Sequence, residues 1–320
     1  MVEAVSAAEP SRGLDIVALG EPMIEFNQTG EGDGRLYRQG FGGDSSNLVV
    51  AAARQGARTG YVTALGDDIY GRMFLALWRD EGVDASGVKI DGSAPTAIYF
   101  VTHADGRHHF TFFRTGSAAS RFAPADLPAD IVSRARVVHL SGISLAISAS
   151  ACDACYAAAH AAKAAGRLVS FDTNLRLKLW SKERARAAIL DMMRIADICL
   201  PSFDDVAELT GLTDPDRLVD LALDLGARTV ALKLGADGTI VATGAERHRI
   251  PPYRVEAVDA TGAGDTFGGS FLARLLKGDD IRAAGRYAAV AAALATTGYG
   301  AVEPIPHARR VEEALQSWPE

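Results

Sequence analysis

The chain has 320 residues and a net charge of −7, from 33 basic and 40 acidic side chains, and it has no Lys/Arg-rich block suited to nucleic acid. Hydrophobic residues make up 48% of the chain, enough for a large core, yet none of their runs approaches the roughly 18 residues of a membrane span. Residues 1–13 lack the basic start and apolar centre of a signal peptide, so we expect a flexible leader and a cytoplasmic protein.

The first part of the chain alternates between strands and helices. Short apolar runs at 15–20 and 59–65 predict buried strands, and the patterns at 44–55 and 70–81 predict helices. Asp44 or Ser45 would cap the first of these helices, and the glycine after it would end it.

The segment 96–114, TAIYFVTHADGRHHFTFFR, interrupts this alternation. Two alternating runs flank Ala-Asp-Gly-Arg, a pattern that predicts a β-hairpin. Residues 23–27 and the run around 36–39 are suited to pair with it. We therefore expect a small antiparallel patch, built from segments about 22–40 and 94–115, that forms a lid over the carboxyl edge of the main sheet.

From residue 134 onward the alternation becomes regular. Strands are predicted at 137–140, 168–172, 198–200 and 229–235, and helices at 149–165, 182–195, 216–225 and 289–298. Strands separated by helices of this length predict parallel βαβ units. The fold class is therefore α/β, with a doubly wound, mostly parallel sheet flanked by helices in a single domain over 14–320.

The cysteines predict no metal or redox site. Cys152 and Cys155 form a C-x-x-C, but it lies in an Ala-rich helical stretch with no second pair and no nearby pair of histidines. With Cys199 they are too few for a disulfide framework. We interpret Cys152 and Cys155 as ordinary helix cysteines.

The run 258–270, VDATGAGDTFGGS, is the strongest chemical signal. Gly262 and Gly264 let the backbone approach an anion, and the amides of Ala263, Gly264 and Asp265 would converge at a helix N-terminus, which favours phosphate. Asp265 beside this cradle could take a proton from an attacking hydroxyl; the alternative is an acid that only caps the helix or occupies its first turn. The full D-x-T-G-A-G-D-x-F pattern favours phosphoryl transfer. A P-loop and a nicotinamide-binding G-x-G-x-x-G after a strand are both absent from the sequence.

A second glycine-rich run, at 40–44, lacks the spacing of a dinucleotide loop. Its glycines suit a backbone that closely approaches a small ligand. Asp44 and Asn47 would then hold sugar hydroxyls, with helix capping as the alternative for Asp44.

These motifs resemble, in content and order, the ribokinase-like PfkB family of carbohydrate kinases. FGGDSSN at 41–47, VTALGDD at 62–68 and DATGAGDTF at 259–267 carry the resemblance, which extends from residue 15 to the last helix. Within the family the chain is most similar to the 2-keto-3-deoxygluconate kinases, through GEPMIEF at 20–26, FTFFRTGSA at 110–118, LSGISLAIS at 140–148 and FDTNLRLKLW at 171–180.

The resemblance implies a transferase that phosphorylates the terminal hydroxyl of 2-keto-3-deoxygluconate with ATP, with Asp265 as general base. The substrate carboxylate suits an arginine fork, and Arg114 and Arg176 match the family's substrate arginines; surface ion pairs are the alternative. Phe112 stands where one type of family member has tyrosine, so a hydroxyl contact is lost. The substrate-binding residues implied are Gly42, Gly43, Asp44, Asn47, Tyr99, Phe112, Arg114, Arg176 and Asp265.

The resemblance also implies the nucleotide site. Mg²⁺ would arrive with ATP rather than in a protein metal site, and Asp205 would organise metal-bound water; a monovalent cation is a further candidate. The loop 233–238 matches the family's nucleotide loop and also reads as a tight turn between two strands, and the helix at 289–298 would flank the adenine. The ATP-binding residues implied are Asn174, Arg176, Ser202, Lys233, Gly235, Ala236, Asp237, Gly238, Gly262, Ala263 and Gly264.

Two other functions are compatible with the same residues. A kinase for fructose, ribose or a nucleoside would keep Asp265; a neutral sugar would not need Arg114, and a nucleoside would use stacking aromatics such as Tyr99 and Phe110. A non-catalytic sugar sensor is disfavoured because it has no use for the base. The expected partners are a sugar acid, ATP and a second copy of the chain paired lid to lid, with neither nucleic acid nor membrane.

Overall fold

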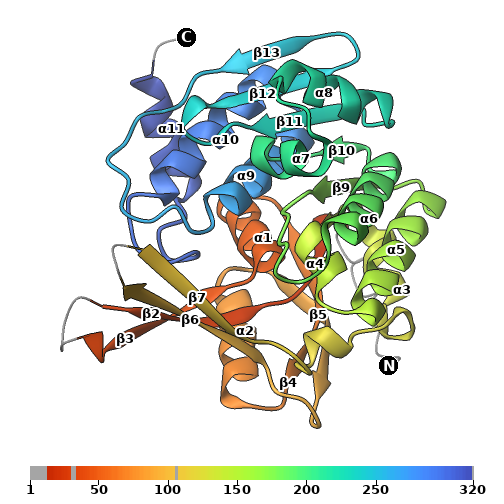
Figure 1. The fold of residues 1–320 in the computed structure, drawn as a ribbon, viewed down its shortest axis with the longest axis vertical. Helices are drawn as coiled ribbons and strands as arrows, with labels where there is room; N and C mark the ends of the chain where they lie inside the picture. The colour runs from red at the N-terminus through yellow and green to blue at the C-terminus, as the bar shows by residue number, and fades with distance from the viewer. Residues whose placement is uncertain (1–12, 30–33, 105–106, 319–320) are drawn as a thin grey trace, which may run out of the picture.

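Nine strands form a central sheet (Figure 1). The computed structural model describes residues 13–29, 34–104 and 107–318, so residues 1–12 of the predicted leader lie outside the described residues. The strands are β1 (Leu14–Leu19), β4 (Thr59–Gly66), β5 (Asp84–Asp91), β8 (Ala135–Ser141), β9 (Leu168–Asp172), β10 (Ile198–Cys199), β11 (Thr229–Lys233), β12 (Thr239–Thr243) and β13 (Arg247–Ile250). Their order is β13–β12–β11–β10–β9–β8–β1–β4–β5, and only the β11–β12 and β12–β13 pairs are antiparallel.

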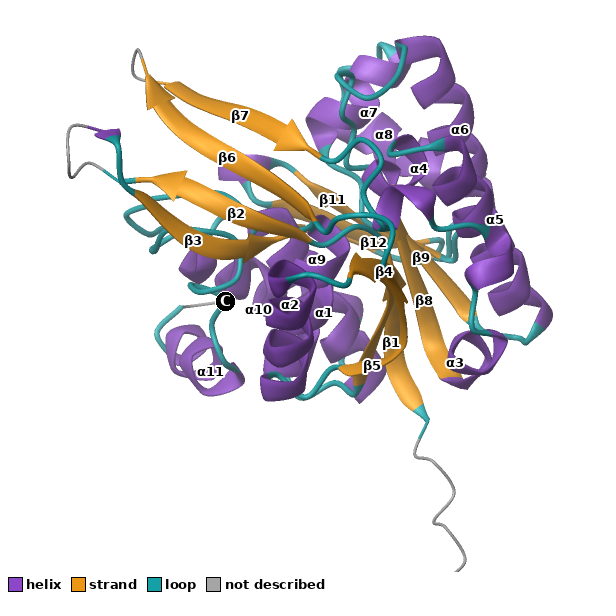
Figure 2. Ribbon diagram, turned by 90° about the horizontal axis from the view of Figure 1, so that it is seen from below, coloured by secondary structure: helices purple, strands orange, loops and turns teal. Residues whose placement is uncertain are grey.

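Helices cover both faces of this sheet (Figures 1 and 2). Since side chains alternate along a strand, β1 sends Val17 and Leu19 into one core and Ile16 and Ala18 into the other. The first core is closed by α3 (Ala129–Arg134), α4 (Gly142–Ala146), α5 (Ala149–Ala164), α6 (Lys182–Ile195), α7 (Phe203–Thr210) and α8 (Pro215–Asp224). The second is closed by α1 (Asp44–Arg54), α2 (Ile69–Asp80), α9 (Ala263–Lys277) and α10 (Ile281–Ala295), with α11 (Ala308–Gln316) packed on α10. Among the described helices, none has the length and apolar character needed to cross a bilayer.

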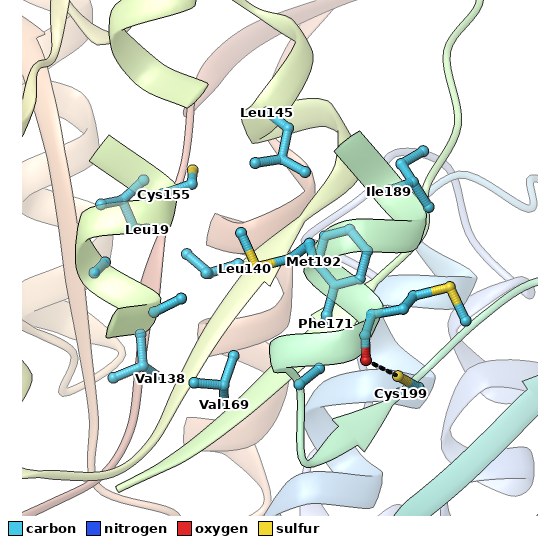
Figure 3. Close-up of a cluster of buried hydrophobic side chains, with 14 of the residues drawn as sticks. Leu19, Val138, Leu140, Leu145, Cys155, Val169, Phe171, Ile189, Met192 and Cys199 are labelled. Atoms are coloured by element: carbon cyan, nitrogen blue, oxygen red, sulfur yellow. Dashed lines mark hydrogen bonds between the residues drawn. The ribbon is translucent and has the colours of Figure 1, made fainter. Parts of the chain in front are cut away.

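The core on the α5 and α6 side contains two of the cysteines (Figure 3). Cys155 is buried on α5 and Cys199 is buried at the end of β10, while Cys152 is half-buried on α5. All three are free thiols, and burial raises the pKa of Cys155 well above its ordinary range. Cys152 and Cys155 therefore lie on a helix, as predicted.

A second, four-stranded sheet forms the lid, in the order β3–β2–β6–β7. Its strands are β2 (Met23–Gln28), β3 (Tyr37–Gly42), β6 (Ala97–Ala104) and β7 (Arg107–Phe113), and Figure 2 shows them projecting from the body of the molecule. The expected antiparallel patch is only partly correct, because β2 and β6 pair in parallel. Both follow parallel strands of the central sheet, β1 and β5, and keep their direction. The hairpin turn at 105–106 lies outside the described residues. The lid-to-lid dimer stays a prediction, and the strands at the two edges of the lid sheet, which could pair with a second copy, are β3 and β7.

The structure adds elements that the sequence analysis does not predict. β5 is an edge strand whose side chains are mostly half-buried or exposed, so its apolar pattern is weak. Helix α7 was not predicted, although it includes Asp205, and α10 begins at Ile281, well before the predicted helix at 289–298.

Helices α1 and α9 can pack closely against each other because α9 has a glycine at their contact. A Cβ placed on Gly269 would lie 2.4 Å from the carbonyl oxygen of Leu48 and 2.9 Å from the Cβ of Ala51, so a side chain at this position would force the helices apart. This contact fixes the first turns of the two helices relative to one another.

Replacing Asp280 with alanine should lower the free energy of unfolding by about 1 kcal/mol. The Asp280 carboxylate caps α10 by accepting a hydrogen bond of 2.7 Å from the amide of Ala283. Urea denaturation monitored by circular dichroism measures the change. Arg282→Ala, an exposed change in the same turn, is the control and should alter stability by less than about 0.5 kcal/mol.

Candidate active site

A cavity of about 1350 Å³ opens between the carboxyl edge of the central sheet and the lid. The lid contributes Met23, Tyr99, Phe110 and Phe112, so the prediction of a lid over this edge is confirmed. Chain order reverses between β1 and β8, and ligands of such sheets bind at this kind of switch point. The opposite walls come from the loops after β9, β10 and β11 and from the start of α9.

Asp265 lies on the cavity wall in the first turn of α9. The helix starts after Gly262, whose φ of 75° is left-handed, and the Asp265 side chain makes no capping bond. Instead its Oδ2 accepts a hydrogen bond of 2.8 Å from Nδ2 of Asn47 on α1. Desolvation, together with the nearby charge of Asp44, raises the pKa of Asp265 to about 7. A carboxylate with this pKa is suited to accept a proton near neutral pH.

Asp44 is not a helix cap, which corrects the capping alternative. The N-cap position of α1 is Gly43, and no side chain caps the helix. The buried Asp44 carboxylate accepts hydrogen bonds from Ser141 Oγ and, at 3.3 Å, from Asn174 Nδ2. Asp44 Oδ1 and Asn47 Oδ1 are buried without a hydrogen-bond partner among the described residues. The hydroxyls of a ligand would satisfy these two acceptors.

The two glycines before α1 bring the chain close to its neighbours. A Cβ on Gly42 would lie 2.5 Å from the hydroxyl oxygen of Tyr99, and one on Gly43 would lie 2.4 Å from the carbonyl oxygen of Glu21. Gly43 and Tyr99 line the cavity, whereas Gly42 supports Tyr99 from behind.

The loop after β9 is held by Asp205. Its Oδ2 accepts hydrogen bonds from Thr173 Oγ1 (3.1 Å) and from the amide of Leu175 (3.0 Å). Asn174, at a left-handed φ of 28°, and Arg176 both line the cavity. The hydroxyl of Ser202 is the N-cap of α7.

The walls also offer oxygen donors suited to a hydrated magnesium ion. Ser202, Asp204 and Asp205 lie together on the cavity wall, and carboxylate and hydroxyl oxygens are hard donors that match Mg²⁺ held through water. Among the described residues, no group of three or more His, Cys, Asp or Glu side chains is arranged to hold a metal ion directly.

Lys233 forms an ion pair with Asp172 across the cavity floor. The sequence analysis assigns no role to Asp172, although it opens the D-T-N-L-R run at the end of β9. Lys233, Gly235 and Asp237 line the cavity, while Ala236 and Gly238 belong to the same tight turn between β11 and β12 without lining it. Gly262 and Gly264 also line it, with Ala263 between them, but no residue of 289–298 does.

Arg114 is not a surface residue and does not line the cavity. Its guanidinium pairs with the fully buried Glu21 and lies 5.7 Å from the ring centre of Phe112, which does line the cavity. Its Nε is a buried donor without an acceptor among the described residues. Burial raises the pKa of Glu21, and the charge of Arg114 opposes this shift. Arg114 therefore lies next to Phe112, at the edge of the aromatic lid wall.

Known proteins resemble this chain over nearly its full length. The family model described as pfkB family carbohydrate kinase matches residues 14–308. A 2-dehydro-3-deoxygluconokinase of Thermoproteus tenax is 37% identical over 97% of each chain, and fructokinase-1 of Oryza sativa subsp. japonica is 36% identical over 94% of this chain and 98% of its own. A crystal structure of fructokinase with bound ATP from Xylella fastidiosa superposes with a TM-score of 0.87 at 26% identity, covering 95% of this chain and 98% of that one.

Proposed function

Because the chain belongs to the PfkB family of carbohydrate kinases, we propose that it transfers the γ-phosphoryl group of ATP to the terminal hydroxyl of 2-keto-3-deoxygluconate. The product is the 6-phosphate. The relative from Thermoproteus tenax supports this sugar acid, and the fructokinases make fructose the second candidate.

The position of Asp265 is the observation that carries the proposal. A carboxylate whose pKa is raised to about 7 lies at a helix N-terminus, directly after Gly262 and Gly264 and beside the unpartnered acceptors of Asp44 and Asn47. A proton acceptor, an anion cradle and hydroxyl acceptors thus share one cavity.

In the proposed reaction Asp44 and Asn47 accept hydrogen bonds from sugar hydroxyls and orient the substrate. Asp265 takes the proton of the terminal hydroxyl while that oxygen forms its bond to the γ-phosphorus and the bond to the ADP oxygen breaks. The amides of Ala263 to Asp265, with Lys233 and Arg176, stabilise charge on the transferred group. Mg²⁺ bound with ATP, beside Ser202 and Asp205, would neutralise phosphate charge.

We assign recognition of the sugar carboxylate to Arg176, which lines the cavity, and to Arg114, which would have to reach past Phe112 when the sugar binds. Arg176 is exposed on the cavity wall, and Arg114 has an unpartnered Nε next to Phe112. A guanidinium offers two parallel donors to a carboxylate, and such charge-assisted bonds are the stronger class.

A substrate panel tests the assignment. ADP release is measured with 2-keto-3-deoxygluconate, fructose, ribose and adenosine, and we expect the keto acid to have the highest kcat/KM. Arg114→Lys keeps a positive charge beside Glu21 but loses the fork, so it should lower kcat/KM for the keto acid by about 10- to 100-fold and leave fructose within about threefold. An equal loss on both sugars, or a wild-type preference for fructose, would reject the sugar acid while retaining the kinase.

A further inference from the structure

Glu25 is a buried acid beside Tyr99 of the cavity wall, and it lines a smaller cavity together with the 299–303 loop. It lies on β2 with 2% of its surface exposed and does not line the main cavity. Its carboxylate accepts hydrogen bonds from the Tyr99 hydroxyl and the Asn27 side chain and lies near the like charge of Asp259, and among the described residues it forms no ion pair with a basic side chain. Burying a carboxylate without a cation costs free energy, so this placement calls for a role.

One oxygen of Glu25 holds the aromatic lid wall. Tyr99 donates its hydroxyl hydrogen to Glu25 Oε2. The Tyr99 ring stacks on Phe112 and Phe110, with ring centres 5.6 and 6.4 Å away, and all three rings line the cavity. The hydrogen bond therefore sets the orientation of the ring that would cover the sugar.

The other oxygen of Glu25 lies against the loop that backs the phosphate cradle. A Cβ on Gly300 would lie 3.2 Å from Glu25 Oε1. The amide of Gly300 donates to Asp259 Oδ2 at 3.0 Å, and Asp259 Oδ1 accepts from the amide and hydroxyl of Thr261, immediately before the cradle. The next residue of the loop, Ala301, is so close that a Cβ on Gly262 would lie 2.8 Å from its carbonyl oxygen.

We propose that Glu25 is a positioning residue, which ties Tyr99 of the lid to the Gly300 loop and through it to the phosphate cradle. The proposal deepens the proposed function and rests on it for the identity of the sugar. Glu25 touches neither substrate: it acts through Tyr99 on sugar binding and through the 299–303 loop on the cradle.

Hydrogen exchange of the free protein tests the tie without any substrate. Glu25→Asp is one methylene shorter, so it could not both accept the Tyr99 hydrogen bond and pack against Gly300, whereas Glu25→Gln keeps the length and one acceptor oxygen. We expect Glu25→Asp to speed exchange at least fivefold in both 97–104 and 299–303, and Glu25→Gln to restore most of the protection. Unchanged exchange at 299–303 in a folded Glu25→Asp protein would overturn the proposal.

A double-mutant cycle tests the action through Tyr99. Glu25→Asp and Tyr99→Phe should each raise the sugar KM about tenfold with kcat within about threefold, and the double variant should be no worse than the poorer single one. Gln28→Ala is the matched control, because it removes two hydrogen bonds within the lid, to Gly34 and His103, and should leave KM unchanged. Multiplying effects would overturn the proposal. The cycle is run with whichever sugar the panel identifies, so a wrong sugar assignment is recognised separately, and the exchange experiment stands if no sugar is phosphorylated.

Discussion

Asp265→Asn is expected to lower kcat by about 10²- to 10⁴-fold, the usual contribution of a positioned general base. Asparagine has the same size and can still bond to Asn47, but it cannot accept the proton of the sugar hydroxyl. ATP and sugar should still bind, because their other contacts are unchanged. Coupled ADP release gives kcat, and isothermal titration with each ligand gives binding.

The pH dependence of kcat/KM is a second test of the role of Asp265. With the pKa of Asp265 raised to about 7, kcat/KM should fall tenfold for each unit of pH below about 7, because the protonated carboxyl cannot act as a base. Asp153→Asn removes a similar charge from an exposed position on α5, outside the cavity, and should keep kcat within about threefold. If Asp265→Asn turned over nearly as fast as the wild type, Asp265 would not be the base.

Gly262→Val is expected to lower kcat by about 10²- to 10³-fold, the effect of losing a donor that stabilises transition-state charge. Valine is strained at a φ of 75°, and its Cβ would lie 2.8 Å from the carbonyl oxygen of Ala301, so the cradle must move. Steady-state kinetics with saturating sugar measure the loss.

The control for this variant lies at the other end of the same helix. Gly278 ends α9 at a φ of 107°, and a Cβ there would meet no atom within 4 Å. Gly278→Val should therefore lower the melting temperature through the same kind of backbone strain but leave kcat unchanged. A similar loss of kcat in both variants would mean that strain in α9, and not the cradle, causes the effect.

Local patterns predicted the parts of the site that are local in the chain. The glycines at 262 and 264 and the acid that follows them are typical of a helix N-terminus that binds an anion. In the structure α9 does begin at this point. The alternation of strands and helices likewise predicted the central sheet. Edge strand β5 was not predicted, because its half-exposed side chains give no clear alternation of apolar and polar residues.

Contacts between distant segments could not be predicted in this way. Asn47 and Asp265 are 218 residues apart and meet only because α1 and α9 pack together. The capping alternative for Asp44 relied on its place before an apolar helix, but tertiary partners, Ser141 and Asn174, occupy its carboxylate instead. The pairing of Arg114 with Glu21 has the same origin, since a single sequence does not show which buried charges face one another.

The close contact at Gly269 has a consequence for wasteful hydrolysis of ATP. Because α1 and α9 are fixed against one another, the packing of the fold itself holds Asp265 against Asn47. If Asp265 is the base, as proposed, it is positioned by the fold and not by the sugar, and it could equally activate a water molecule. Under that proposal, protection of ATP from hydrolysis would come from the lid sheet that covers the acceptor and not from moving the base out of place.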